Sequence, residues 1–116
     1  MKRLFRLTRP IDFKRVRRSG KSYAHPLVVL YVMKSEAAGV RVGVSAGLAV
    51  GNAVKRNRAK RLLRAATNEL LPQITVGSDL LLIARSPLPA SDLQQTCAAL
   101  SILLERAGLL AQIHDA

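Results

Sequence analysis

The chain of 116 residues is short, strongly basic and poor in aromatic side chains. Apolar residues make up 49% of it and aromatic ones 3%, so we expect one domain over residues 1–116 with an aliphatic core. Cys97 is the only cysteine, which excludes an internal disulfide and a cysteine zinc site. No apolar stretch approaches the roughly 20 residues that cross a bilayer, and the basic beginning has no secretory signal pattern. These features predict a cytoplasmic protein with no membrane partner.

Positive charge is concentrated in the first part of the chain. Nineteen Lys and Arg against seven Asp and Glu give a net charge of +12 and a pI near 11.3. Residues 1–64 hold seventeen of the basic and two of the acidic side chains. The mutual repulsion of these basic side chains is best relieved by a polyanion, so the charge favours nucleic acid as the partner. An anionic membrane surface is the second alternative, and a basic domain without a polyanionic partner is the third.

The first half of the chain predicts one helix and two strands. Residues 1–8 are expected to form a flexible basic arm. Pro10 then opens a short helix that ends near Arg18. The apolar run over residues 27–33 is typical of a strand buried on both faces. Alternating valines over residues 40–46 predict a second strand, paired antiparallel with the first.

The next segment predicts a long helix followed by a buried strand. Asn52 is a good N-cap, and Pro72 ends the helix at about Leu71. A turn then leads into a strand over residues 80–84.

A last helix is predicted after the two prolines at 87 and 89. Ser91 and Gln94 have the spacing of a capping box, and Gly108 ends the helix before a tail over residues 109–116. The apolar side chains that repeat at helical spacing are Leu93, Cys97, Leu100, Leu104 and Ala107. The order α-β-β-α-β-α predicts an α/β (α+β) two-layer sandwich in which helices pack on a small mixed sheet.

The long helix separates apolar from charged side chains. At about 100° per residue, one arc faces the sheet and comprises Ala59, Leu62, Leu63, Ala66 and Leu70. The opposite arc comprises Arg56, Asn57, Lys60, Arg61, Arg64 and Asn68, with Arg58 at its edge. Six cations lie between Lys55 and Arg64, and no acid follows until Glu69, so like charges repel at i,i+4 spacing. This arrangement favours phosphate binding, because the guanidinium fork matches phosphate oxygens, over the alternative of a solvated charged face.

Residues 51–64, GNAVKRNRAKRLLR, resemble the signature helix of the bacterial ribonuclease P protein subunit. Asp12-Phe13 with Val16 resembles the first helix of that family, and Arg41-Val42-Gly43 resembles its second strand. Ile83-Ala84-Arg85 is similar to the end of the strand after the long helix. The resemblance covers roughly residues 3–108.

This resemblance implies a protein cofactor of an RNA enzyme that removes the 5′ leader of precursor tRNA by Mg²⁺-dependent hydrolysis. It implies the ribonuclease P RNA subunit and precursor tRNA as partners, with no obligatory protein partner. Catalysis and Mg²⁺ would belong to the RNA, so no catalytic residue, cofactor or metal ligand is expected in the protein. The resemblance also implies a left-handed strand–helix–strand crossover, although such units are generally right-handed.

Two RNA surfaces follow from the resemblance. The surface for the catalytic RNA comprises Lys55, Arg56, Arg58, Lys60, Arg61 and Arg64. A cleft between the first helix and the sheet, for the leader, comprises Phe13, Arg17, Tyr31, Arg56 and Asn57. Single-stranded RNA binds to aromatic platforms along a basic groove, and Phe13 and Tyr31 would supply these platforms. The alternative is that both side chains belong to the hydrophobic core.

The chain departs from the family at two places. Arg17 stands where the family often has a second aromatic residue, so contact between its guanidinium and a base would replace stacking there. Leu48 and Ala49 stand where the family usually has a lysine pair, so this loop lacks the cations that an RNA contact there would use.

Three other functions compete with this interpretation. Residues 43–47, GVSAG, match the G-x-S-x-G pattern of a serine hydrolase, but the helix begins only after Asn52 and the only downstream histidine is His114. A ribosomal or other structural RNA-binding protein would share the charge distribution. A helix-turn-helix DNA-binding module fits less well, because the basic helix lies between strands.

Overall fold

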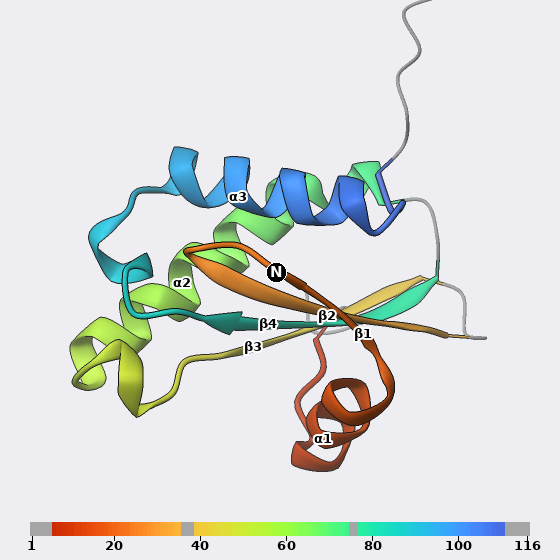
Figure 1. Ribbon diagram of the computed structural model, residues 1–116, viewed down its shortest axis with the longest axis horizontal. Coiled ribbons are helices and arrows are strands. Elements are labelled where there is room, and N and C mark those ends of the chain that lie inside the picture. Colours follow the sequence, from red (N-terminus) through yellow and green to blue (C-terminus); the bar gives the residue numbers. More distant parts are fainter. Residues whose placement is uncertain (1–5, 36–38, 75–76, 111–116) are drawn as a thin grey trace, which may run out of the picture.

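The computed structural model describes residues 6–35, 39–74 and 77–110. Within these ranges the chain forms α1 (Pro10–Ser19), β1 (Lys21–Ala24), β2 (Val28–Lys34), β3 (Val40–Ser45), α2 (Ala53–Leu70), β4 (Ser78–Ala84) and α3 (Leu93–Arg106). Short 3₁₀ helices lie at η2 (Leu48–Val50), η3 (Leu71–Gln73) and η4 (Leu88–Ala90). Helices α2 and α3 cover one face of the sheet and α1 lies on the other (Figure 1). The predicted mixed α+β class is confirmed, and α1 adds a partial third layer.

The strands form one mixed sheet in the order β1-β2-β4-β3. The prediction that β2 pairs with β3 is wrong, because β4 lies between them. β4 pairs antiparallel with β2 and parallel with β3. Six of its seven residues are buried, so the central position covers this nearly continuous apolar strand on both faces.

Strand β1 was not predicted. It is four residues long, three of them are exposed, and it forms the edge of the sheet beside β2. Gly20 connects it to α1 by a close backbone approach, since a Cβ atom there would lie 2.5 Å from the Val16 carbonyl oxygen and 2.8 Å from that of Val32. Any side chain at this position would push α1 away from the sheet.

The sheet separates two groups of core side chains. The larger lies between the sheet and the helices α2 and α3, and the smaller lies under α1 around Leu7, Val16 and Leu81. In β2 the burial predicted for both faces is found on one face only. Val28, Leu30 and Val32 pack into the larger core, whereas Tyr31 and Met33 are half-buried under α1.

Both long helices lie where they were predicted, with small errors. Asn52 caps α2 as expected, but Leu62 is half-buried and Thr67 takes a buried place instead. The capping box of α3 is formed by Asp92 and Gln95, because the buried hydroxyl of Ser91 donates to the Leu88 carbonyl oxygen. The buried face of α3 comprises Thr96, Ala99, Leu100, Leu103 and Leu104.

The ends of the described chain are packed against the fold. The arm predicted over residues 1–8 is wrong at Leu7, which is buried and donates its N–H to the Val42 carbonyl oxygen; residues 1–5 lie outside the described residues. The predicted tail likewise begins with a buried Leu109, and residues 111–116 lie outside. The left-handed crossover from β3 through α2 to β4 stays a prediction. Among the described helices, none has the length and apolar character of a membrane span.

Candidate nucleic-acid interface

The cations of α2 form two rows that face different parts of the molecule. Lys60 and Arg64 face a cleft toward α1 and β3, and Arg58 and Arg61 face a notch toward α3. Within the described chain, the ion pairs found belong to other residues, so no acid neutralises either row. The mutual repulsion of these side chains is therefore left for a bound anion to relieve.

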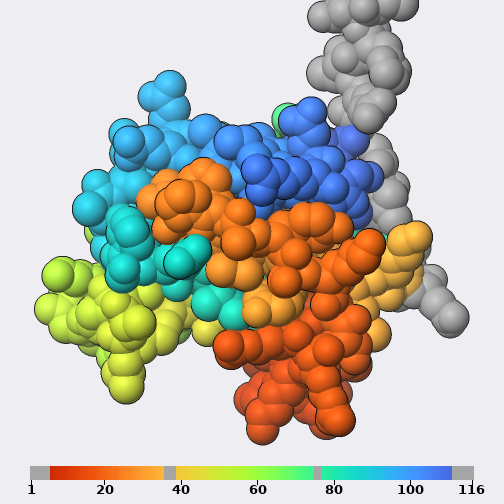
Figure 2. Space-filling model, in the orientation of Figure 1, coloured from red at the N-terminus to blue at the C-terminus, as the bar shows by residue number. Residues whose placement is uncertain are grey.

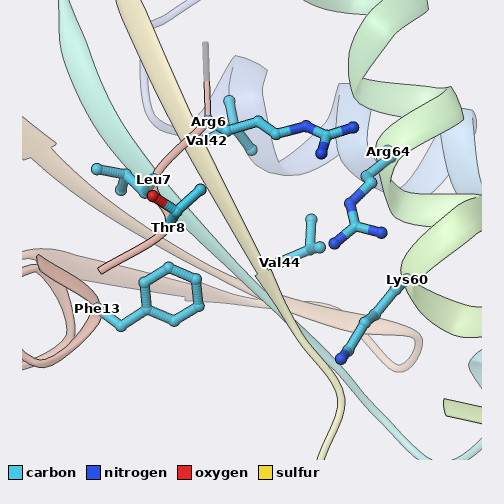
Figure 3. A pocket seen from close by; sticks show the side chains of 8 residues that line it. All are labelled: Arg6, Leu7, Thr8, Phe13, Val42, Val44, Lys60 and Arg64. Atoms are coloured by element: carbon cyan, nitrogen blue, oxygen red, sulfur yellow. The ribbon is translucent and has the colours of Figure 1, made fainter. Parts of the chain in front are cut away.

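The first row helps to line a cleft that we call the Phe13 cleft. It measures about 290 Å³ and is lined by Arg6, Leu7, Thr8, Phe13, Val42, Val44, Lys60 and Arg64. Figure 3 shows the Phe13 ring on one side and Lys60 and Arg64 on the other, with Val44 between them. In the space-filling view, α1 and the start of α2 project from the same side of the molecule with a hollow between them (Figure 2). An aromatic wall opposite a cationic wall suits a single-stranded nucleic acid.

Phe13 is placed in this cleft by the backbone of β3. Its ring lies against Gly43, where a Cβ atom would come within 2.7 Å of Cε1. Tyr31 packs in the same small cluster under α1 but does not line the cleft. The two predicted aromatic platforms are therefore neighbours of one cluster, and only Phe13 faces the open space.

The Arg58 side chain is anchored within the protein. Its Nε donates to the Pro89 carbonyl oxygen at 2.7 Å, and its Nη2 donates to that of Ser91 at 3.1 Å. These bonds connect α2 to the segment before α3. Arg61 forms no hydrogen bond or ion pair with another described residue, so its charge is free for an anion.

A buried carboxylate connects α1 to the sheet on the opposite side of the molecule from α3. Asp79 of β4 is 1% exposed and accepts from Arg41 of β3 at 2.9 and 3.0 Å and from Arg15 of α1 at 2.8 Å. Burial raises the pKa of Asp79, but the two guanidinium groups outweigh it and hold that pKa below its ordinary value. The charged cluster therefore fixes α1, which carries Phe13, on the sheet.

Comparison with known proteins shows the family to which the chain belongs. The Ribonuclease P family model matches residues 1–108. The chain belongs to the ribonuclease P protein family. It is 41% identical over 109 residues to the ribonuclease P protein component of Herpetosiphon aurantiacus, covering 94% of this chain and 89% of the relative. It is 43% identical over 114 residues to that of Chloroflexus aggregans, covering 95% and 82%.

Solved structures of ribonuclease P proteins share the fold. The Staphylococcus aureus RNase P protein aligns with a TM-score of 0.81 at 30% identity, over 91% of this chain and 97% of that one. The protein from Thermotoga maritima aligns with a TM-score of 0.78 at 28% identity, over 87% and 96%. The family resemblance and the predicted mixed α+β class are thereby confirmed.

Membership in the ribonuclease P family makes the chain a component of a tRNA-processing ribonucleoprotein whose partner is the RNA subunit. It decides against the ribosomal and helix-turn-helix alternatives. The serine hydrolase alternative also fails on geometry, because Ser45 ends β3 and α2 begins only at Ala53. The described residues include no group of three or more side chains positioned to hold a metal ion.

The residues that line the Phe13 cleft differ from those predicted for the leader cleft. Of the five residues predicted for the cleft, only Phe13 lines it, while Arg17, Tyr31, Arg56 and Asn57 do not. Lys60 and Arg64, predicted for the catalytic RNA, line the cleft instead, because the rotation of α2 about its axis turns this row toward α1. The prediction missed Arg6 and Thr8, which were placed in the arm. The alternation of polar and apolar side chains at Arg6, Leu7 and Thr8 could have indicated their position, since it is typical of an extended segment along a sheet.

The loop that departs from the family is also described. Leu48 lies in η2 and is 83% exposed, so the position of the usual lysine pair presents an apolar side chain to solvent. This loop offers no cation of its own before Lys55.

Proposed function

We propose that this chain assembles with ribonuclease P RNA through α2 and holds the 5′ leader of precursor tRNA in the Phe13 cleft. The RNA subunit then carries out the Mg²⁺-dependent hydrolysis that removes the leader. The observation that carries the proposal is the pairing of Phe13 with Lys60 and Arg64 across one cleft. A base stacks on the ring, and the phosphates on either side of it lie within the field of the two cations.

The assembly surface is the remainder of the cationic helix. Lys55 and Arg61 are exposed, and Arg56 is half-buried on the same helix between them. Their charges act on the phosphates of a folded RNA, which releases counterions and makes assembly salt-dependent. The separation of the two rows allows α2 to contact both RNAs at once, so that the protein joins the leader to the catalytic RNA.

The assignment of hydrolysis to the RNA agrees with the roles of the protein's titratable groups. Hydrolysis of a phosphodiester by side chains requires a histidine pair or carboxylates at the bound strand. The residues lining the Phe13 cleft include neither. His25 accepts from the Leu27 N–H through Nδ1 in the β1–β2 turn, and Asp79 is held by two arginines. The side chains that line the Phe13 cleft do not fit a protein-held Mg²⁺, because none of them is a carboxylate.

Reconstitution tests this proposal. The protein is mixed with a bacterial ribonuclease P RNA at a Mg²⁺ concentration too low for the RNA alone, and cleavage of precursor tRNA is measured. We expect restored cleavage with wild-type protein and loss of this effect in the double variant Lys60→Gln, Arg64→Gln. Arg106→Gln, which removes an exposed charge at the far end of α3, serves as the control. Absence of stimulation by the wild-type protein would refute the function.

A further inference from the structure

The notch between α2 and α3 combines an apolar floor with cationic rims. It measures about 230 Å³ and is lined by Arg58, Arg61, Leu62, Ala65 and Leu93. It shares no lining residue with the Phe13 cleft, so it is a separate surface. Leu93 is 36% exposed although it is large and apolar. Such a side chain beside two arginines is stabilised if a partner covers it.

Arg58 gives this notch a rigid wall. Because Nε and Nη2 are both bonded to carbonyl oxygens of the segment before α3, the plane of the guanidinium group is held in one orientation. The conformational entropy of this side chain is therefore lost on folding and not on binding. A planar guanidinium group with its edge occupied still offers its face, on which a nucleobase can stack.

We propose that the notch receives one unpaired nucleobase of ribonuclease P RNA, stacked on Arg58 above Leu62, Ala65 and Leu93. Arg61, which has no partner among the described residues, then lies beside the phosphate of the same nucleotide. This inference rests on the proposed function, and it adds a base-binding subsite to a helix otherwise described by its charges.

The chemistry of the notch favours a base over a phosphate. Two of the three nitrogens of Arg58 already donate within the protein, which leaves few donors for a doubly coordinated phosphate. The floor is aliphatic and supplies no donor. Asp92, next to Leu93, keeps its carboxylate at the start of α3, where it accepts from the Gln95 N–H at 2.8 Å. This negative charge would repel a phosphate inside the notch, whereas it would not repel a neutral base.

Binding of the protein to a bacterial ribonuclease P RNA over a series of KCl concentrations tests the proposal. Leu93→Asn replaces the apolar floor without changing charge, and Ile102→Asn makes the same kind of change at another exposed position of α3, where the side chain is 44% exposed. We expect Leu93→Asn to weaken binding about five-fold, because the base loses an apolar contact. The salt slope should stay unchanged, because no phosphate contact is lost. Ile102→Asn should bind as wild type. Equal affinity of the two variants would overturn the proposal.

Arg58→Lys provides a second test at the same subsite. It retains the charge but removes the planar group, so we expect weaker binding with an unchanged salt slope. Thermal unfolding of the free protein measures any loss of the anchor to Pro89 and Ser91 separately. Binding equal to wild type would overturn the stacking role of Arg58.

A pool of the RNA with randomly placed abasic nucleotides locates the base. Molecules that bind are separated from those that do not, and the positions where base loss prevents binding are read out. We expect loss of the base at one unpaired position to weaken binding of the wild-type protein. Loss of the same base should not weaken binding of Leu93→Asn further. Identical patterns for both proteins would refute the subsite while leaving the proposed function intact. If the wild-type protein does not bind the RNA at all, the proposed function itself fails, and the subsite fails with it.

Discussion

The ring of Phe13 lies on the backbone of Gly43, so close that a Cβ atom at position 43 would come within 2.7 Å of Cε1 and 2.8 Å of Cζ. This contact joins α1 to β3 and sets the aromatic wall of the Phe13 cleft. It also explains the first glycine of the GVSAG segment, which serves the packing of an aromatic ring and not the strained turn of a hydrolase.

Gly43→Ala should displace the Phe13 ring and weaken leader binding. The ring is the free end of a side chain and can move aside, so we expect a stability cost of only about 1 kcal/mol. The dissociation constant of the reconstituted enzyme for precursor tRNA should rise about five-fold, the lower range for loss of one stacked base. That for mature tRNA should not change. Gly47→Ala is the matched control, because a Cβ atom there meets nothing within 4 Å. Equal losses for precursor and mature tRNA would contradict the placement of Phe13.

The two cationic rows of α2 should act on different RNAs. Lys60→Gln with Arg64→Gln should lower the salt slope of leader binding by about 0.7 for each lost phosphate contact, the value for single strands. Assembly with the RNA subunit should keep its slope. Arg61→Gln should lower the salt slope of assembly with the RNA subunit and leave that of leader binding unchanged. Measurement of both binding reactions against KCl concentration separates the rows, and a common effect of both variants on one reaction would show that the rows are not distinct.

The elements that could be predicted from sequence are those encoded by local patterns. The N-cap Asn52 and the apolar period of α2 define a helix without reference to the rest of the fold. The apolar runs of β2 and β4 define strands in the same way. β1 escaped prediction because an exposed edge strand of four residues needs no apolar pattern, and its pairing with β2 supplies its stability.

The features that could not be predicted depend on tertiary contacts. The neighbour of β2 was decided by β4, which follows it by more than forty residues and needs cover on both faces. The capping box was misplaced by one residue, because the hydroxyl of Ser91 is bonded inside the turn before α3. The position of Lys60 in the lining of the Phe13 cleft was not foreseen for a similar reason. A helical wheel shows that a side chain is exposed but not which neighbouring element it faces.

Cys97 should be an unreactive thiol. Burial raises the pKa of Cys97 to about 11, and the hydrogen bond that its Sγ donates to Glu69 Oε2 at 3.2 Å contributes to this rise. At neutral pH the thiol is protonated, and only the thiolate reacts with alkylating agents. The rate of alkylation by iodoacetamide should therefore stay low until the pH approaches this value. Glu69→Gln removes the negative charge and should shift the rate profile toward lower pH. A profile that follows free cysteine in the wild-type protein would contradict this.

Asp79→Asn should destabilise the fold in a pH-dependent manner. The pKa of Asp79 is lowered in the folded state, so its contribution to the free energy of unfolding is complete above the ordinary aspartate pKa of about 3.9 and is lost as the pH falls through the folded value. At neutral pH we expect a loss of up to about 3 kcal/mol, the lower range for breaking a buried ion pair. Urea unfolding at several pH values should show the difference between the two proteins shrinking below about pH 4. A difference that does not vary with pH would mean that packing, and not charge, is lost.

The two arginines that hold Asp79 should differ in their effect on RNA. Arg15 comes from α1, whereas Arg41 comes from β3 within the sheet. Arg15→Met releases α1 while leaving Asp79 paired, so precursor tRNA should bind more weakly and the RNA subunit as before. Arg41→Met should lower the free energy of unfolding with a smaller effect on precursor binding, because α1 keeps its bond to Asp79. If Arg15 acted by contacting RNA directly, Arg15→Met would lower the salt slope of precursor binding, and Asp79→Asn would not reproduce its effect. The double variant Arg15→Met, Asp79→Asn tests whether the two residues act together. If it binds precursor tRNA no more weakly than Arg15→Met alone, Arg15 and Asp79 act together to place Phe13 at the cleft.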